Sequence, residues 1–125
     1  MIEKILIADD EPNIVISLEF LLKREGFEVS VARDGQEALD AIRRDRPQLV
    51  LLDVMMPKKS GYDVCQEVRA DELIKGTKIL MLTARGRELD IAKGSAMGAD
   101  DYMTKPFSTK ELVLKVRELL GSPGP

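Results

Sequence analysis

The sequence predicts an α/β fold built on a doubly wound parallel sheet with helices on both faces. Two features of its 125 residues indicate this architecture. Short and nearly continuous aliphatic runs, which are typical of strands buried on both faces, alternate with segments of helical spacing. Four of the runs also end directly on a carboxylate, a hydroxyl or an ammonium group. Because parallel strands place their carboxyl ends along one edge of a sheet, we expect these groups to share one crevice.

The first half of the chain predicts three strands separated by two helices. Residues 4–9 form the first apolar run, and Pro12 suits the first turn of the helix that follows. Residues 27–32 alternate apolar and polar side chains, as a half-exposed strand does. Asp34 is a typical N-cap for the second helix, which leads into a third strand at 48–53.

The second half of the chain continues the alternation. A helix ending near Ala70 precedes a strand at 77–83. A weaker helix is expected over about 87–97, because one glycine interrupts it and another follows it. A short strand comes next at 100–104, and Ser108 suits the N-cap of the last helix. The connections between these parallel strands should be right-handed crossovers.

Composition limits the classes of function. The length fits one domain with one core, and the net charge of −3, with acids and bases interleaved, provides no basic surface for nucleic acid. No apolar stretch approaches membrane-spanning length. The single cysteine, Cys65, cannot form an internal disulfide, which favours a reducing, cytoplasmic location. The sequence has no histidine, so a bound metal would need oxygen ligands, as Mg²⁺ does.

Five polar side chains at the ends of the predicted strands are candidate functional residues: Asp9, Asp10, Asp53, Thr83 and Lys105. Three carboxylates at one sheet edge would repel one another unless a cation such as Mg²⁺ lies between them. Asp53 directly follows four aliphatic residues, and a partly desolvated carboxylate beside a metal can attack phosphorus. Each residue alone also has a simpler interpretation, as a helix cap, a strand-end side chain or a surface charge. Their consistent placement favours one functional site.

The candidate residues lie in four motifs, which are IADDE at 7–11, LLDVMMP at 51–57, LTA at 82–84 and DDYMTKPF at 100–107. Gly61 follows the Met-Pro turn of the second motif. In their order, spacing and predicted context, these motifs resemble the receiver domain of two-component response regulators. The resemblance extends over nearly all of the chain from Ile5 to Leu120.

The resemblance implies a specific version of the predicted fold. It is a flavodoxin-like, five-stranded parallel sheet of order 2-1-3-4-5, with helices on both faces. The receiver domain is expected over residues 1–120, and residues 121–125 are expected to be a flexible tail or the stub of a linker.

The resemblance also implies a Mg²⁺ site with assigned ligands. Asp10 would bind the ion directly, and Asp9 would contribute through a water molecule. Asp53 would supply a further ligand, and the backbone carbonyl of Met55 another.

Asp53 is implied to be the phosphoacceptor, which takes a phosphoryl group from a histidine kinase or a histidine phosphotransfer protein. Lys105 would pair with the phosphoryl oxygens, and Thr83 would bond to the phosphoryl group and draw its loop inward. Tyr102 would be an aromatic switch that turns from solvent to the interior. The peptide bond between Lys105 and Pro106 is expected to be cis. Such a domain is not an enzyme beyond its own Mg²⁺-dependent phosphoryl transfer and dephosphorylation.

The output partner is left open by the sequence. DNA-binding members of the family often dimerise through three cross-dimer charge pairs, of which only Asp101 with Lys115 keeps its charges here. The chain also stops after its last helix. Both observations favour a stand-alone receiver, or one taken from a regulator with another output. We expect a monomer or a phosphorylation-dependent dimer that does not itself contact nucleic acid or membrane.

Two other classes of function use similar residues. A hydrolase of the haloacid-dehalogenase type also forms an aspartyl phosphate, but it would need an aspartate at the position of Met55. A degenerate receiver binds partners without phosphate and usually lacks one of the acidic or lysine residues, all of which are present here. A phosphorylation-controlled signalling switch is therefore the favoured hypothesis.

Overall fold

The computed structural model describes residues 2–84 and 97–121 of the chain. In this part, five parallel strands form one sheet in the order β2-β1-β3-β4-β5, which confirms the predicted topology. The strands are β1 (Lys4–Ala8), β2 (Glu28–Ala32), β3 (Leu49–Asp53), β4 (Lys78–Ala84) and β5 (Asp101–Lys105).

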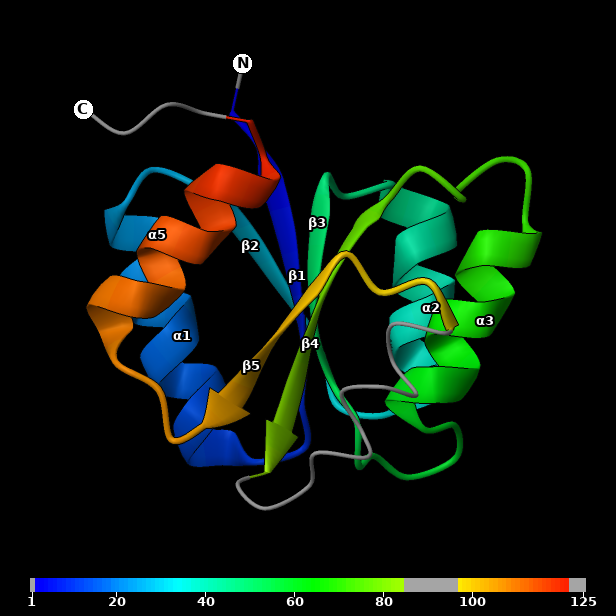
Figure 1. Cartoon of the computed structure of the whole chain (residues 1–125), viewed down its shortest axis with the longest axis horizontal. Helices are drawn as coiled ribbons and strands as arrows, with labels where there is room; N and C mark the ends of the chain where they lie inside the picture. Colours follow the sequence, from blue (N-terminus) through cyan, green and yellow to red (C-terminus); the bar gives the residue numbers. More distant parts are fainter. Residues whose placement is uncertain (1, 85–96, 122–125) are drawn as a thin grey trace.

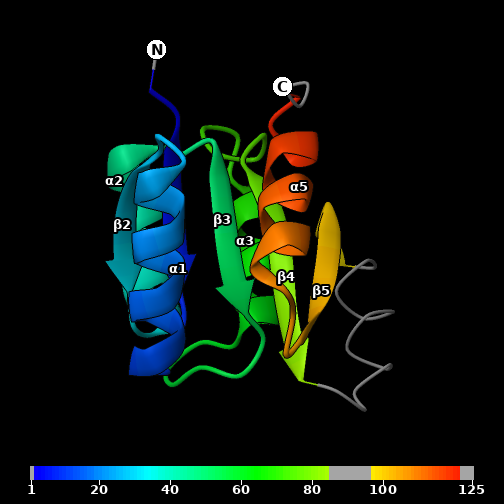
Figure 2. The ribbon, with the colours of Figure 1, turned by 90° about the vertical axis from the view of Figure 1, so that its left-hand side faces the viewer.

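Helices cover both faces of the sheet. Helices α1 and α5 lie on one face, and α2 and α3 lie on the other (Figures 1 and 2). Their bounds are α1 (Pro12–Arg24), α2 (Gly35–Asp45), α3 (Gly61–Ala70) and α5 (Thr109–Leu119). The helix expected over 87–97 lies, apart from Met97, outside the described residues. Within residues 2–84 and 97–121, no helix has the length and hydropathy needed to cross a bilayer.

Side-chain caps fix the starts of three helices. The carboxylate of Asp34 and the hydroxyl of Ser108 each accept a hydrogen bond from the first turn of the following helix, as predicted. Ser60 and Asp63 form a reciprocal capping box at the start of α3. These helices follow β2, β5 and β3, so the caps secure the loops at the carboxyl edge of the sheet.

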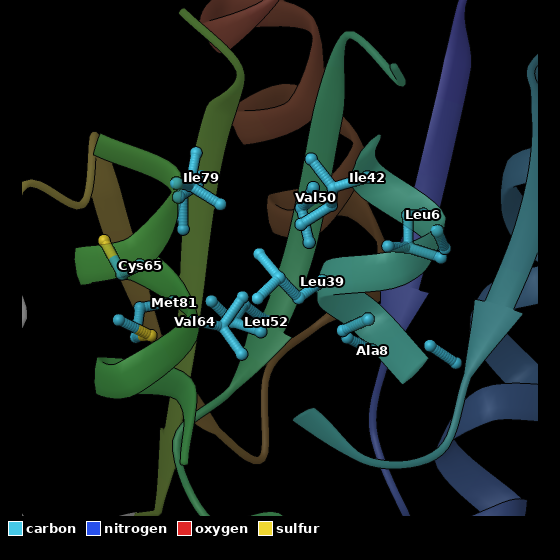
Figure 3. Close-up of a cluster of buried hydrophobic side chains, with 14 of the residues drawn as sticks. Leu6, Ala8, Leu39, Ile42, Val50, Leu52, Val64, Cys65, Ile79 and Met81 are labelled. Atoms are coloured by element: carbon cyan, nitrogen blue, oxygen red, sulfur yellow. The ribbon is translucent and has the colours of Figure 1, made fainter. Parts of the chain in front are cut away.

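Two apolar clusters, one under each layer of helices, form the core. The cluster beneath α2 and α3 contains Leu52, Val64 and Met81, and Figure 3 shows its strand and helix side chains facing one another. The cluster beneath α1 and α5 contains Leu51 and Val116. Because the consecutive residues Leu51 and Leu52 enter opposite clusters, β3 is buried on both faces, as its continuous aliphatic run predicts.

Strand β2 shows the predicted alternation, since Val29 and Val31 pack against the cluster beneath α1 and α5. Val29, Ser30 and Val31 are nevertheless all partly exposed. The reason is its place at the edge of the sheet, where β1 is its one neighbouring strand and helices α1 and α2 each contact it. Partial cover from both helices gives the two faces similar exposure.

Truncation of a central core residue tests this description of the core. Leu51→Ala is expected to lower the free energy of unfolding by about 2–5 kcal/mol, because the side chain is fully buried and its removal leaves a cavity. The matched control is Leu114→Ala on α5, where the leucine is 57% exposed and the change should stay within about 0.5 kcal/mol. Urea unfolding measures both variants, and equal losses would contradict the assignment of the core.

Candidate functional site

The candidate site lies at the carboxyl edge of the sheet, toward which the strand arrowheads point in Figure 1. Asp9 directly follows β1, and Asp53 is the last residue of β3. Thr83 lies one residue before the end of β4, and Lys105 ends β5. The parallel register brings the ends of β1 and β3 to the same level. The sheet therefore brings the predicted strand-end residues together.

Three carboxylates form the centre of the site. Asp9, Asp10 and Asp53 each place an oxygen within 4.8 Å of those of the other two. Asp9 and Asp53 are buried, with 0% and 6% exposure, whereas Asp10 is exposed. The backbone N–H of Glu11 donates to Asp9 Oδ1 at 2.9 Å, and that of Met55 donates to Asp53 Oδ1 at 3.3 Å. The loops after β1 and β3 thus hold the two buried carboxylates.

Lys105 brings a positive charge to these carboxylates. Its Nζ donates a hydrogen bond to Asp9 Oδ2 at 2.8 Å, and it lies 3.5 Å from Glu11 Oε1 and 3.6 Å from Asp53 Oδ2. Burial disfavours the ammonium, but the hydrogen bond to Asp9 and the nearby negative charges outweigh it, so the pKa of Lys105 is raised. Lys105 is therefore protonated at neutral pH. The bond from Lys105 to Pro106 is cis, as expected.

One ammonium does not balance the negative charge around Asp53. Burial, and then the neighbouring Asp9 carboxylate, raise the pKa of Asp53 to about 7, although Lys105 acts in the opposite direction. An added cation would relieve this repulsion. The donors are all carboxylate oxygens, which suit a hard divalent ion such as Mg²⁺.

Thr83 adds a buried hydroxyl to the same edge. The residue is 1% exposed, and its Oγ1 has no hydrogen-bond partner among the residues that the structure describes. It is one position beyond Leu82, which is the register partner of Asp53 on the neighbouring strand. A buried hydroxyl without a partner costs about 1–3 kcal/mol, so an acceptor bound near Asp53 could stabilise this strand end.

Four other residues lie in or near the elements that form the site. Tyr102 lies on β5, is 37% exposed and is not part of the carboxylate cluster. The side chain of Met55 is 58% exposed, which leaves its backbone as the group with a possible site role. Sequence reasoning missed the contact of Glu11 with Lys105, although the IADDE motif places Glu11 directly after Asp10. Gly61 is needed because a Cβ there would lie 2.5 Å from the carbonyl oxygen of Asp53.

The charge imbalance predicts an unusual effect of removing the Asp53 carboxylate. In metal-free buffer near pH 8, Asp53→Asn should stabilise the fold by roughly 1–3 kcal/mol, because it removes a buried and incompletely balanced charge. Between the ordinary pKa of 3.8 and about 7, folded Asp53 binds more protons than unfolded Asp53. The wild-type fold therefore loses stability as pH rises through this window. The stability gained by Asp53→Asn should accordingly shrink as the pH is lowered toward about 4.

Urea unfolding in the presence of EDTA, at about pH 5 and about pH 8, measures this gain. Asp40→Asn is the control, because Asp40 is an exposed carboxylate on α2. A loss of stability at the higher pH, or a gain that grows on acidification, would contradict the account of the charge balance.

Comparisons with known proteins agree with this geometry. The family model of the response regulator receiver domain matches residues 5–117. The chain is 47% identical to the alkaline phosphatase synthesis transcriptional regulatory protein PhoP of Bacillus subtilis, over 96% of this chain and 49% of that protein. It is 48% identical to the DNA-binding response regulator MtrA of Mycolicibacterium smegmatis, over 96% of this chain and 51% of that protein. The chain thus spans about half the length of these curated relatives.

Solved structures share the fold over nearly the whole chain. The chemotaxis response regulator CheY4 of Vibrio cholerae has a TM-score of 0.89 and 32% identity, covering 95% of this chain and 99% of that one. The receiver domain of the sensor histidine kinase PA1611 from Pseudomonas aeruginosa has a TM-score of 0.89 and 30% identity, covering 98% and 100%. That structure contains a magnesium ion coordinated in its active-site cleft. From its family match, its relatives and its fold, the chain belongs to the response regulator receiver domains of two-component systems.

Proposed function

We propose that this receiver domain is a phosphoacceptor switch in which Asp53 takes a phosphoryl group from a phosphorylated histidine. The observation that carries the proposal is the position of Asp53, a buried carboxylate near Asp9 and Asp10 with the Lys105 ammonium 3.6 Å away. The donor is a histidine kinase or a histidine phosphotransfer protein. The domain spans residues 1–120, and the tail or linker expected over residues 121–125 lies, apart from Gly121, outside the described residues.

The residues at this edge fit a Mg²⁺ ion. Asp9, Asp10 and Asp53 offer only oxygen donors, and their negative charge exceeds the positive charge of Lys105. The backbone carbonyl of Met55, in the loop directly after β3, supplies a further oxygen. When bound, Mg²⁺ would neutralise charge on the carboxylates and on the oxygens of the incoming phosphoryl group.

Asp53 acts as the nucleophile. One of its carboxylate oxygens forms a bond to phosphorus as the bond from phosphorus to the histidine nitrogen breaks, and the electron pair of that bond stays on the nitrogen. Lys105 then pairs with the transferred phosphoryl group, because its charged Nζ already lies beside Asp53. The Asp9 carboxylate, which pairs with Lys105 before transfer, would then lose that hydrogen bond.

Thr83 and Tyr102 carry the conformational response. The hydroxyl of Thr83, which has no partner in the described part of the chain, donates a hydrogen bond to a phosphoryl oxygen. This bond draws the end of β4 toward Asp53, and Tyr102 turns from the surface toward the interior. Phosphorylation thus shifts an equilibrium between two conformations, which the output partner distinguishes.

The one retained charge pair of the family's dimer contact supports a monomer before phosphorylation. Lys115 Nζ lies 2.8 Å from Asp101 Oδ2 within the same chain, so these charges already satisfy each other. We therefore assign a monomer to the unphosphorylated state and allow dimerisation only after phosphorylation. The location is the cytoplasm, where histidine kinases present their phosphohistidine.

A small phosphodonor tests the proposed function without a cognate kinase. With Mg²⁺ and acetyl phosphate, the protein should gain one phosphoryl group that is stable in acid and labile in base, and peptide mapping should place it on Asp53. EDTA should prevent the gain, and Asp53→Asn should abolish it. The control Asp40→Asn alters an exposed carboxylate and should behave as the wild type.

Two outcomes would contradict the proposal. Phosphoryl incorporation into Asp53→Asn would place the acceptor elsewhere. No incorporation into folded wild-type protein would favour a receiver that binds partners without phosphate.

A further inference from the structure

We infer that Gly35 is a positioning residue for the proposed metal site, an inference that rests on the proposed function. Gly35 is the first residue of α2, and it lies outside the strand-end motifs. It contacts the loop of residues 54–60, which joins β3 to α3 and which we name the β3–α3 loop. That loop carries Met55, whose backbone carbonyl is one of the proposed ligands.

The backbone of Gly35 packs directly on this loop. Its N–H donates a hydrogen bond to the carbonyl oxygen of Pro57 at 3.2 Å. A Cβ at position 35 would overlap the carbonyl oxygen of Lys59 and lie only 2.5 Å from the Cβ of Lys59. Because two of the three nearest atoms belong to the Lys59 backbone, the loop itself would have to move to accept a side chain. Glycine therefore allows α2 to approach the β3–α3 loop this closely.

Two further contacts fix the conformation of the middle of the β3–α3 loop. The carbonyl oxygen of Pro57 also accepts a hydrogen bond from the N–H of Lys59 at 2.8 Å, which closes a tight turn. Between them, Lys58 has a φ of 69° and places its Nζ 3.6 Å from Asp34 Oδ2, next to Gly35. The start of α2 and the turn at 57–59 therefore hold each other in place.

The ends of the loop are anchored separately. The N–H of Val54 donates to the carbonyl oxygen of Leu82 on β4 at 3.1 Å, and the N–H of Gly61 donates to the carbonyl oxygen of Val54 at 2.9 Å. Met55 thus lies between Val54, which is hydrogen-bonded to the sheet, and Pro57, which is hydrogen-bonded to the start of α2. The position of the Met55 carbonyl depends on both of these hydrogen bonds.

A displaced turn would affect the metal more than the fold. Mg²⁺ requires nearly octahedral geometry at short distances, so a small shift of the Met55 carbonyl away from the carboxylates weakens binding. The carboxylates of Asp9 and Asp10 follow β1, and that of Asp9 is held by the N–H of Glu11 rather than by this turn. Gly35 therefore affects Mg²⁺ affinity through one ligand, the backbone carbonyl of Met55.

The test is Mg²⁺ affinity measured by calorimetry with the metal alone, alongside the stability of each variant. Gly35→Ala should raise the dissociation constant for Mg²⁺ about tenfold. This value is the lower end of the loss of metal affinity expected when a group that orients a metal ligand is disturbed. The control is Gly76→Ala, because a Cβ at Gly76 would meet no atom within 4 Å. Gly76→Ala should bind Mg²⁺ as the wild type does.

A second pair of variants disturbs the same contact from the loop side. Lys59→Ala and Lys59→Gly both lose the ion pair with Glu67 at 2.8 Å, but only Lys59→Gly removes the Cβ that packs against Gly35. Lys59→Gly should bind Mg²⁺ several-fold more weakly than Lys59→Ala. If Gly35→Ala does not fold, this pair decides the question.

Two results would overturn the inference in different ways. Wild-type Mg²⁺ affinity in folded Gly35→Ala, whatever its stability, would show that Gly35 is needed for packing alone. An absence of Mg²⁺ binding in the wild-type protein would instead overturn the proposed function, and the inference with it.

Discussion

The ion pair between Lys105 and Asp9 is the contact on which the rest of the site depends. Its 2.8 Å separation places one ammonium among three carboxylates, and Asp53 lies only 3.6 Å from the same nitrogen. This charge is enough to hold the carboxylates together in the fold but not enough to balance them, as the raised pKa of Asp53 indicates. The same imbalance gives the site its capacity for a divalent cation.

Interactions elsewhere in the fold offset the repulsion among these three carboxylates. Parallel register brings the ends of β1, β3, β4 and β5 to one edge, while two apolar clusters hold the sheet between its helices. The loops at that edge are secured by capped helix starts and by close backbone contacts at Gly35 and Gly61. The apolar core thus provides the stability that the grouped charges remove, and the loops set the geometry in which those charges act.

The sequence predicted most of this arrangement because its strongest signals are local. Aliphatic runs locate the strands, and the residue after each run must lie at the carboxyl edge, so Asp9, Asp53 and Lys105 could be placed without coordinates. The alternation of β2 was also predicted, whereas the partial exposure of both its faces depends on the cover that two helices provide. The contact of Glu11 with Lys105 and the approach of Gly35 to the β3–α3 loop join segments far apart in the sequence, and no periodic pattern signals them.

The central claim is that Lys105 exchanges Asp9 for a phosphoryl group on Asp53. A crystal structure of the protein with Mg²⁺ and beryllofluoride, which mimics an aspartyl phosphate, tests it most directly. We predict beryllium bonded to an Asp53 oxygen, with Lys105 Nζ about 3 Å from a fluorine and farther from Asp9 than its present 2.8 Å. A structure in which Lys105 keeps its hydrogen bond to Asp9 and Asp53 carries no beryllofluoride would contradict the account.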